Sequence, residues 1–440
     1  MFSDKKEQGG KKNNGKVVVG YDLGKTVSQI SFSFLSEGEV ETISCVAGTE
    51  QYNIPTVLCK RNGVNQWFYG KEALKYAKEE DGILVEDLLN LAERGEEVLV
   101  EGESYDPAAL LTLFVKRSLS LLNMRLSLNQ IEALMFTVEE LTPRMVEVLS
   151  KVVAGLQLKT EHLFFQSHLE SFYYYTLYQP EDLWRHDVYI FEYSSHLKCF
   201  CLERNYKTTP QVVFITETEY PEMQRLSFPE KEEDRQQQKE YLDKKFLSVA
   251  QEELNGKNVS TVYLLGDGFK NSWAKDSLRF LCRNRRVFQG NNLYSKGACY
   301  SVQERLDDQK SQTMIFLGKD KLKTNVGMEV SRQGEDSYLA ILDGGENWYE
   351  CQKQWDVILR EGNMIRLKLT PLNGRNVRYV EMVLDGLPER ERNNTRLRME
   401  AVMLNEKTLQ IQIKDMGFGE FVPASNLCFS QQIDLDLGGR

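Results

Sequence analysis

The chain has 440 residues, of which 41% are hydrophobic and 27% charged, and its formal net charge is −10. This length predicts about two to four domains, and the acidic balance excludes non-specific nucleic-acid binding, which needs a basic surface. Apolar runs are shorter than the ~20 residues of a membrane span, and residues 1–14 form a polar tail without an apolar signal core. We therefore expect a cytoplasmic protein with no membrane and no nucleic-acid partner.

The first predicted element is a strand that begins at Val17 and ends in a Gly-x-Asp-x-Gly turn. The turn and the residues after it are Gly20, Tyr21, Asp22, Leu23, Gly24, Lys25 and Thr26. Glycines let backbone N–H groups approach a phosphate, and the carboxylate could hold a hydrated Mg²⁺. An ordinary hairpin shows the same pattern, so a phosphate site is indicated only if partner motifs follow.

Further segments follow in an order that is known from one ATPase superfamily. They are residues 54–57 with 69–73, 137–138 with 143–145, 262–269, 286–288 and 297–299. With residues 17–28, they resemble the actin-like ATPase superfamily, and most closely the DnaK-type (seventy-kilodalton heat-shock) chaperones. The resemblance implies an α/β fold of two ribonuclease-H-like lobes over residues 15–306.

This resemblance also implies a site for ATP with Mg²⁺. The residues it assigns to nucleotide binding are Gly20, Asp22, Gly24, Lys25, Thr26, Glu192, Gly266, Asp267 and Gly268. If nucleotide binds, Asp22 would orient the metal through water, Glu192 would be the second acidic group, and the later glycines would lie under the adenosine. No residue is assigned a catalytic role.

The second phosphate loop departs from the family pattern of an acid followed by consecutive glycines. Here the acid is Glu192, but Tyr193, Ser194, Ser195 and His196 follow it. The side chains at positions 194 to 196 would intrude on the phosphates, and a left-handed turn without glycine would cost about 1–3 kcal/mol. This departure predicts weakened nucleotide binding.

Two further departures concern catalysis and the adenine pocket. No lysine or arginine lies between Lys78 and Arg94, where the family's catalytic lysine is expected. Only about 73 residues separate Tyr193 from Gly266, too few for the family's helical subdomain that clamps adenine. The charged run 229–239 is interpreted instead as the solvated start of an amphipathic helix over about 237–255.

Lys25 replaces a threonine of the family pattern and admits two interpretations. It could bind phosphate, or it could neutralise a carboxylate cluster of Asp22, Glu192 and Asp267 in place of a metal. We favour the second interpretation, which would make the cleft a sealed structural joint.

Cysteines and histidines are interpreted as packing residues. The eight cysteines lack paired C-x-x-C spacing and indicate reduced core thiols. A zinc site at Cys199, Cys201 and His196 would lack ligands. All four histidines lie between residues 162 and 196 in an aromatic-rich segment, where we expect them to fill half-polar positions.

The last part of the chain predicts a separate all-β domain at residues 313–440, after a polar linker at 307–312. Strands are expected at 313–317, 337–343, 357–359, 364–369, 379–384, 397–403 and 409–414. With residues 324–328, their order resembles the β-sandwich peptide-binding domain of DnaK-type chaperones. No helical lid follows, so a bound peptide would exchange fast.

Three hypotheses remain open. The first is a divergent DnaK-like pseudo-ATPase that has largely lost catalysis and works by binding a protein partner or an unfolded peptide. The second is a nucleotide-gated, ATP-binding molecular chaperone with weak hydrolysis. The third is a small-molecule kinase, which needs a general-base aspartate that residues 137–200 do not obviously supply.

Overall fold

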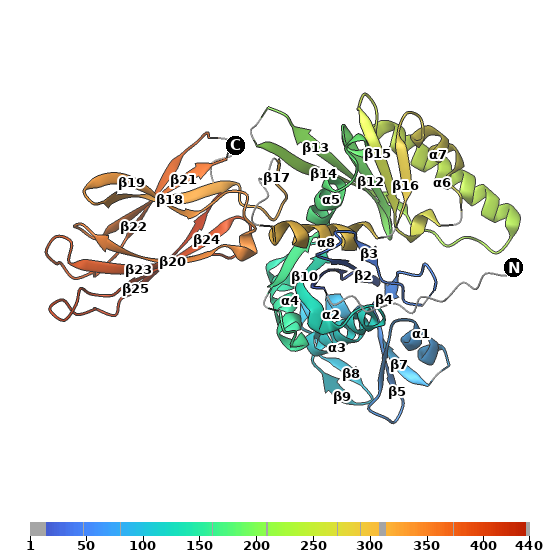
Figure 1. Cartoon of the computed structure of the whole chain (residues 1–440), viewed down its shortest axis with the longest axis horizontal. Helices are drawn as coiled ribbons and strands as arrows, with labels where there is room; N and C mark the ends of the chain where they lie inside the picture. The colour runs from blue at the N-terminus through green and yellow to red at the C-terminus, as the bar shows by residue number, and fades with distance from the viewer. Residues whose placement is uncertain are drawn as a thin grey trace, which may run out of the picture. The chain divides into compact units, whose positions relative to one another are not determined.

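The computed structural model describes residues 15–46, 48–79, 81–160, 162–207, 210–270, 272–290, 292–307, 314–372 and 374–436. The expected tail and almost all of the expected linker lie outside these described residues. The chain divides into two compact units, Met1–Met314 and Ile315–Arg440 (Figure 1). Within the described part of the chain, no helix is long and apolar enough to cross a membrane.

The first sheet of the first unit combines an antiparallel meander with two parallel strands. Its order is β11-β10-β1-β2-β3, and β4 pairs with β2. The strands are β1 (Val17–Asp22), β2 (Val27–Phe34), β3 (Glu41–Thr42), β4 (Ile54–Pro55), β10 (Ile131–Val138) and β11 (His162–Ser167). β1, β2 and β3 pair antiparallel, whereas β10 runs parallel to both β1 and β11. β1 is buried along its whole length, as its run of valines favours in a covered central strand.

The second sheet repeats this arrangement. Its order within the first unit is β16-β15-β12-β13-β14. The strands are β12 (Asp187–Tyr193), β13 (His196–Asn205), β14 (Gln211–Gln224), β15 (Val259–Leu265) and β16 (Arg286–Gln289). Again the first three strands in chain order pair antiparallel, and β15 runs parallel to β12 and β16.

The two sheets also share a register. The parallel pair β1–β10 is irregular only just after Val17, and the pair β12–β15 only just after Asp187. Five positions beyond each irregularity (17 to 22, and 187 to 192) the chain has Asp22 and Glu192. Two carboxylates therefore occupy equivalent places at the ends of two similar strands.

One helix follows the last strand of each sheet, and these two helices pack against each other. These are α5 (His168–Leu177), which follows β11, and α8 (Leu293–Arg305), which follows β16; α8 also packs on β1. A Cβ at Gly297 would lie 1.9 Å from the carbonyl oxygen of Ser171, so the two helices need glycine here to come this close. The pair brings the amino-terminal ends of α5 and α8 together.

The remaining helices cover the sheets and support a small subdomain on the first one. They are α1 (Gly70–Lys78), α2 (Leu88–Arg94), α3 (Pro107–Leu119), α4 (Pro143–Leu156), α6 (Glu232–Glu253) and α7 (Lys275–Leu281). Short strands form a sheet of order β6-β5-β7 and a hairpin of β8 with β9. Their bounds are β5 (Leu58–Arg61), β6 (Trp67–Tyr69), β7 (Gly82–Val85), β8 (Val98–Val100) and β9 (Glu103–Tyr105).

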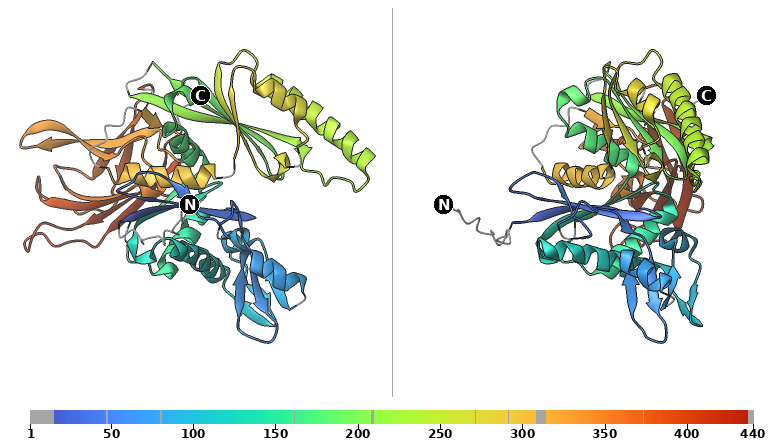
Figure 2. Two further views of the ribbon diagram at one scale, coloured as in Figure 1. Left: turned by 45° about the vertical axis from the view of Figure 1, so that its right-hand side comes forward. Right: turned by 90° about the vertical axis from the view of Figure 1, so that its right-hand side faces the viewer.

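Helix α6 begins earlier than its hydrophobic pattern predicts. It starts at Glu232 rather than near residue 237, because three acidic residues in its first turn favour the positive end of the helix dipole. Its first buried residue is Leu242, so the amino-terminal half is solvated (Figure 2). The interpretation of the charged run as a solvated helix start is confirmed.

The second unit consists of two four-stranded antiparallel sheets, of order β19-β18-β21-β22 and β20-β23-β24-β25. Their strands are β18 (Thr324–Arg332), β19 (Glu335–Leu342), β20 (Gln352–Leu359), β21 (Met364–Pro371), β22 (Arg378–Val383), β23 (Thr395–Met403), β24 (Thr408–Asp415) and β25 (Cys428–Asp434). A short strand, β17 (Met314–Phe316), spans the boundary between the units. Sequence reasoning missed β25, because this strand at the sheet end buries only Ile433 and shows no strong alternation.

A buried ion pair fixes the loop after β24. Asp415 is fully buried and accepts hydrogen bonds from both terminal nitrogens of Arg390, each at 2.7 Å. It also accepts from the backbone N–H groups of Gly417 and Ser425. The Arg390 guanidinium holds the pKa of Asp415 well below its usual range.

We expect Asp415→Ala to lower the free energy of unfolding by about 3–5 kcal/mol, because it leaves a buried guanidinium without its partner. Asp356→Ala removes a half-exposed partner of Arg398 and should cost about 0–1 kcal/mol. Urea unfolding of the full chain measures both. Equal losses of unfolding free energy in the two variants would contradict the assignment of Asp415–Arg390 as the more stabilising of the two ion pairs.

Candidate functional site

Four side chains connect the ends of the two sheets through the helix pair. Asp22 ends β1, and its Oδ1 lies 2.8 Å from Nε2 of His168, the first residue of α5. The His168 ring stacks on the Tyr294 ring of α8, with centroids 4.0 Å apart and planes 7° apart. Tyr294 donates its hydroxyl to Oε2 of Glu192 at 2.7 Å. We call these four residues the acid bridge.

The acid bridge has approximate two-fold symmetry. Asp22 is the last residue of β1, and Glu192 is the last but one of β12. Each ring belongs to the helix that follows the last strand of the same sheet. Asp22 therefore pairs within the first half of the unit and Glu192 within the second. The ring contact between His168 and Tyr294 joins the halves.

Electrostatics favour a charged histidine and a neutral tyrosine here. Burial alone would lower the pKa of His168, but the Asp22 carboxylate and, less strongly, Glu192 and Glu139 outweigh it and raise that pKa above 6.5. Burial, reinforced by Glu192, raises the pKa of Tyr294 well above its usual value. One imidazolium therefore lies among three carboxylates, and the phenol remains a donor.

A second set of charges links the two halves beside the acid bridge. Glu139, just after β10, lies 2.9 Å from Nζ of Lys25 and 3.0 Å from Nζ of Lys198 on β13. Burial alone would raise the pKa of Glu139, but the two ammonium groups lower it to about 2. Lys198 also pairs with Glu219 on β14 at 3.1 Å.

The prediction that Lys25 neutralises Asp22 is wrong. Lys25 pairs with Glu139, and the cation on Asp22 is His168. Asp267 does not join the two other carboxylates in these contacts, since it pairs with Lys270 at 2.7 Å and is partly exposed. Thr26 and Lys25 are both exposed, in the turn between β1 and β2.

Packing accounts for the glycines that the sequence suggested for nucleotide contact. A Cβ at Gly20 would lie 2.2 Å from the carbonyl oxygen of Ser295 in α8. At Gly266 and Gly268 it would lie 2.6 Å and 2.5 Å from atoms of Tyr193, at the end of β12. At Gly24 it would lie 2.2 Å from the carbonyl oxygen of Val27 within the turn. Each glycine is required by a close approach inside the protein.

The turn between β12 and β13 avoids the strain expected without glycine. Neither Ser194 nor Ser195 is among the described residues with positive φ. Ser195 donates its hydroxyl to, or accepts from, Nδ1 of His196 at 3.1 Å. The loop therefore forms a short hairpin turn in ordinary backbone geometry, and the predicted strain is absent.

His168 is the site residue that sequence reasoning missed. All four histidines were interpreted as packing residues, and for His168 this is wrong because it forms an ion pair with Asp22. In the structure His168 lies directly between β11 and α5, a strand-to-helix junction that the sequence analysis did not predict. The aromatic content of the segment concealed it.

Cysteines near the second sheet are buried in its core. Cys199 and Cys201 pack among Tyr189 and Val262, and burial raises the pKa of both thiols. Cys201 also lies with Asp187 and Glu203, their ligand atoms within 4.8 Å of one another. Glu203 is held there by Lys257 at 3.1 Å, so the cluster has a structural explanation.

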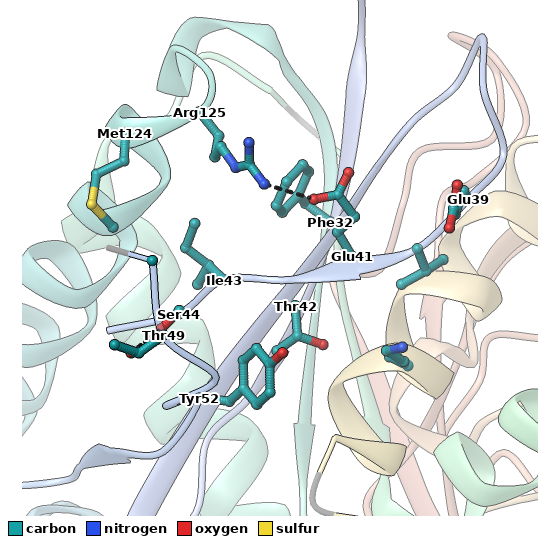
Figure 3. Close-up of a pocket in the computed structure, with 13 residues that line it drawn as sticks. Phe32, Glu39, Glu41, Thr42, Ile43, Ser44, Thr49, Tyr52, Met124 and Arg125 are labelled. Atoms are coloured by element: carbon teal, nitrogen blue, oxygen red, sulfur yellow. Dashed lines mark hydrogen bonds and ion pairs between the residues drawn. The ribbon is translucent and has the colours of Figure 1, made fainter. Parts of the chain in front are cut away.

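A separate pocket of about 690 Å³ lies beside β3, away from the acid bridge. Figure 3 shows Arg125 reaching Glu41, whose Oε2 is 3.2 Å from an Nη atom, and Tyr52 beside Thr42. Lys296 and Glu39 also line it. Its acidic and basic groups are balanced, and no predicted nucleotide residue is among those lining it.

Two family models match the chain. One is described as "Family of unknown function (DUF5716) C-terminal" and matches residues 39–319; the other, "Domain of unknown function (DUF8552)", matches residues 321–435. The first contains His168, Glu192 and Tyr294 but not Asp22. A search of curated proteins finds no match.

We expect Gly20→Ala to destabilise the first unit by about 1–3 kcal/mol or more in the absence of any ligand, because its methyl group collides with backbone of α8. Gly290→Ala is the matched control, since a Cβ there meets no atom within 4 Å and its φ is ordinary. Thermal unfolding of the two variants measures the difference. A stable Gly20→Ala protein would remove the packing explanation.

The raised pKa of His168 predicts that the stability of the protein falls as pH rises. Its pKa is raised in the folded protein, so its contribution is complete below pH 6.5 and is lost as pH rises through the folded pKa. We expect the melting temperature to drop between pH 6 and 9 by more in the unaltered protein than in His168→Gln. His162→Gln, which removes an exposed imidazole, should keep the full drop. Parallel curves for all three proteins would contradict this role of His168.

Proposed function

The chain belongs to the DUF5716 C-terminal family, and we propose that its first unit is a degenerate actin-like module that acts by binding rather than by ATP hydrolysis. The acid bridge carries the proposal. In this view the two halves, each a ribonuclease-H-like lobe, are held together by side chains where an active relative would hold a magnesium nucleotide. The protein would act in the cytoplasm as a DnaK-like binder of a protein partner or peptide.

Repeated topology supports the superfamily part of the proposal. Two sheets share strand order, strand direction and the position of one register irregularity. Each sheet has a carboxylate within the last two residues of its central strand, and a helix of the central pair follows its last strand. The equivalent register positions of Asp22 and Glu192 add to this support.

The residues present do not fit a magnesium nucleotide well. Asp22 is only 8% exposed, and its Oδ1 faces His168 rather than a water-filled space. A buried imidazolium at this position would repel Mg²⁺ and compete for the same carboxylate. The space beside the glycines that would admit a nucleotide is filled by backbone and ring atoms of the protein. We therefore assign no chemical step to ATP.

The second unit supports a binding role. Its two sheets place alternating residues of β23 and β24 in a common core and leave the strands at the ends of each sheet open to pairing within the described residues. Such open edges are typical places for strand addition by a peptide. The alternative is a nucleotide-gated chaperone, which would require His168 to leave Asp22.

We expect ATP with Mg²⁺ to give no heat of binding in isothermal titration and to leave the melting temperature unchanged at millimolar concentration. Ligand at 100 times its Kd would stabilise the protein by about 2.7 kcal/mol, which a melting curve detects readily. An active DnaK-type ATPase domain in the same buffer is the positive control. A Kd below about 100 μM, lost in Asp22→Ala, would favour the nucleotide-gated alternative.

A further inference from the structure

A hollow of about 480 Å³ lies at the edge of the second sheet, at β16. It is lined by Pro180, Asp182, Leu183, Cys282, Arg285, Arg286, Val287 and Phe288. Successive side chains of a strand point to opposite faces. A hollow lined by the consecutive residues 286, 287 and 288 therefore lies over the edge of the strand, and not over one face of the sheet.

The edge itself is unpaired within the described residues. β16 is the last strand of its sheet and pairs only with β15, in parallel (Figure 1). It is also partly apolar on the outside, since Phe288 is 40% exposed although its ring stacks on Tyr263. An open edge of this kind offers backbone N–H and C=O groups to another extended chain.

Arg285 indicates the charge of what binds there. Its Nη1 is buried and has no hydrogen-bond partner among the described residues, while its guanidinium lies 5.1 Å from the centre of the Phe280 ring. A buried guanidinium nitrogen without an acceptor is costly, and a carboxylate is its natural bidentate partner. Burial already lowers the pKa of Arg285, in the direction expected for a desolvated cation without an anion.

Local charge agrees with this. The segment 279–286 carries four arginines in a chain whose net charge is −10. Only Arg279 has an ion pair there, with Asp276 at 2.9 Å. No ion pair of Arg283, Arg285 or Arg286 occurs in the described part of the chain. The hollow itself is lined by two arginines, Arg285 and Arg286, and by one carboxylate, Asp182, so its net charge is positive and favours an acidic partner.

We propose that the β16 edge binds an extended, acidic segment of a partner protein, with a carboxylate on Arg285 and an apolar side chain in the hollow beside Phe288. The proposal rests on the binding role proposed above and specifies its site and partner chemistry. Main-chain hydrogen bonds to β16 would supply affinity, and the arginines would supply selectivity for acidic residues.

Selection from a displayed library of random ten-residue peptides, against the full chain, tests this. We expect enriched peptides to alternate apolar and acidic residues. The best one, synthesised with a fluorescent label, should bind Arg285→Gln roughly 10- to 100-fold more weakly by anisotropy, as expected for loss of a charge-assisted pair. Arg279→Gln is the matched control and should bind normally. Hydrogen exchange should slow at amides 286–289 when the peptide binds.

One further measurement keeps the test decisive if Arg285→Gln folds poorly. The same peptide with lysine in place of its acids should lose binding to the unaltered protein. Peptides without acidic enrichment, equal binding to both arginine variants, or no exchange protection in β16 would overturn the proposal. Binding of acetate or phosphate in the hollow, without binding of any peptide, would also overturn the proposal. The ATP titration does not depend on peptide binding. If no peptide binds β16, the proposal that the first unit does not bind nucleotide can still be tested by that titration.

Discussion

Two carboxylates at the ends of the two central strands impose the main constraint on the first unit. Asp22 and Glu192 are each brought toward the meeting point of two helices, and buried like charges repel strongly unless a cation or donor lies between them. His168 and Tyr294 supply one positive charge and one hydroxyl donor, stacked face to face. The ring contact between His168 and Tyr294 therefore joins the two halves beside these carboxylates.

Close helix packing and the acid bridge depend on each other. Gly297 allows α5 and α8 to touch backbone to backbone, and Gly20 allows α8 to lie on β1. Only this approach brings the rings of His168 and Tyr294 into contact. The neighbouring pairs of Lys25 and Lys198 with Glu139 add a second link between the halves. Two glycines far apart in the sequence thus allow the charged and aromatic side chains of the acid bridge to meet.

Much of the local structure was predictable. The strand that ends at Asp22, most of the helix predicted over about 237–255 and the late β-strands follow from alternation and turn residues. Errors occurred where the partner of a residue lies far away in sequence. Gly266 and Gly268 were expected under the adenosine of a nucleotide, but each lies against Tyr193 instead. β25 was missed because a strand at the end of a sheet needs little apolar alternation.

By itself, the sequence determined the order of elements, the separation into a mixed α/β part and an all-β part, and the acidic residues at the ends of two strands. Only the tertiary structure decided which groups face those acids. Residues 22 and 168 are separated by 146 positions, and 192 and 294 by 102. Local periodicity carries no information on contacts at that separation, because they arise from how sheets and helices pack. Packing placed His168, rather than Lys25, beside Asp22.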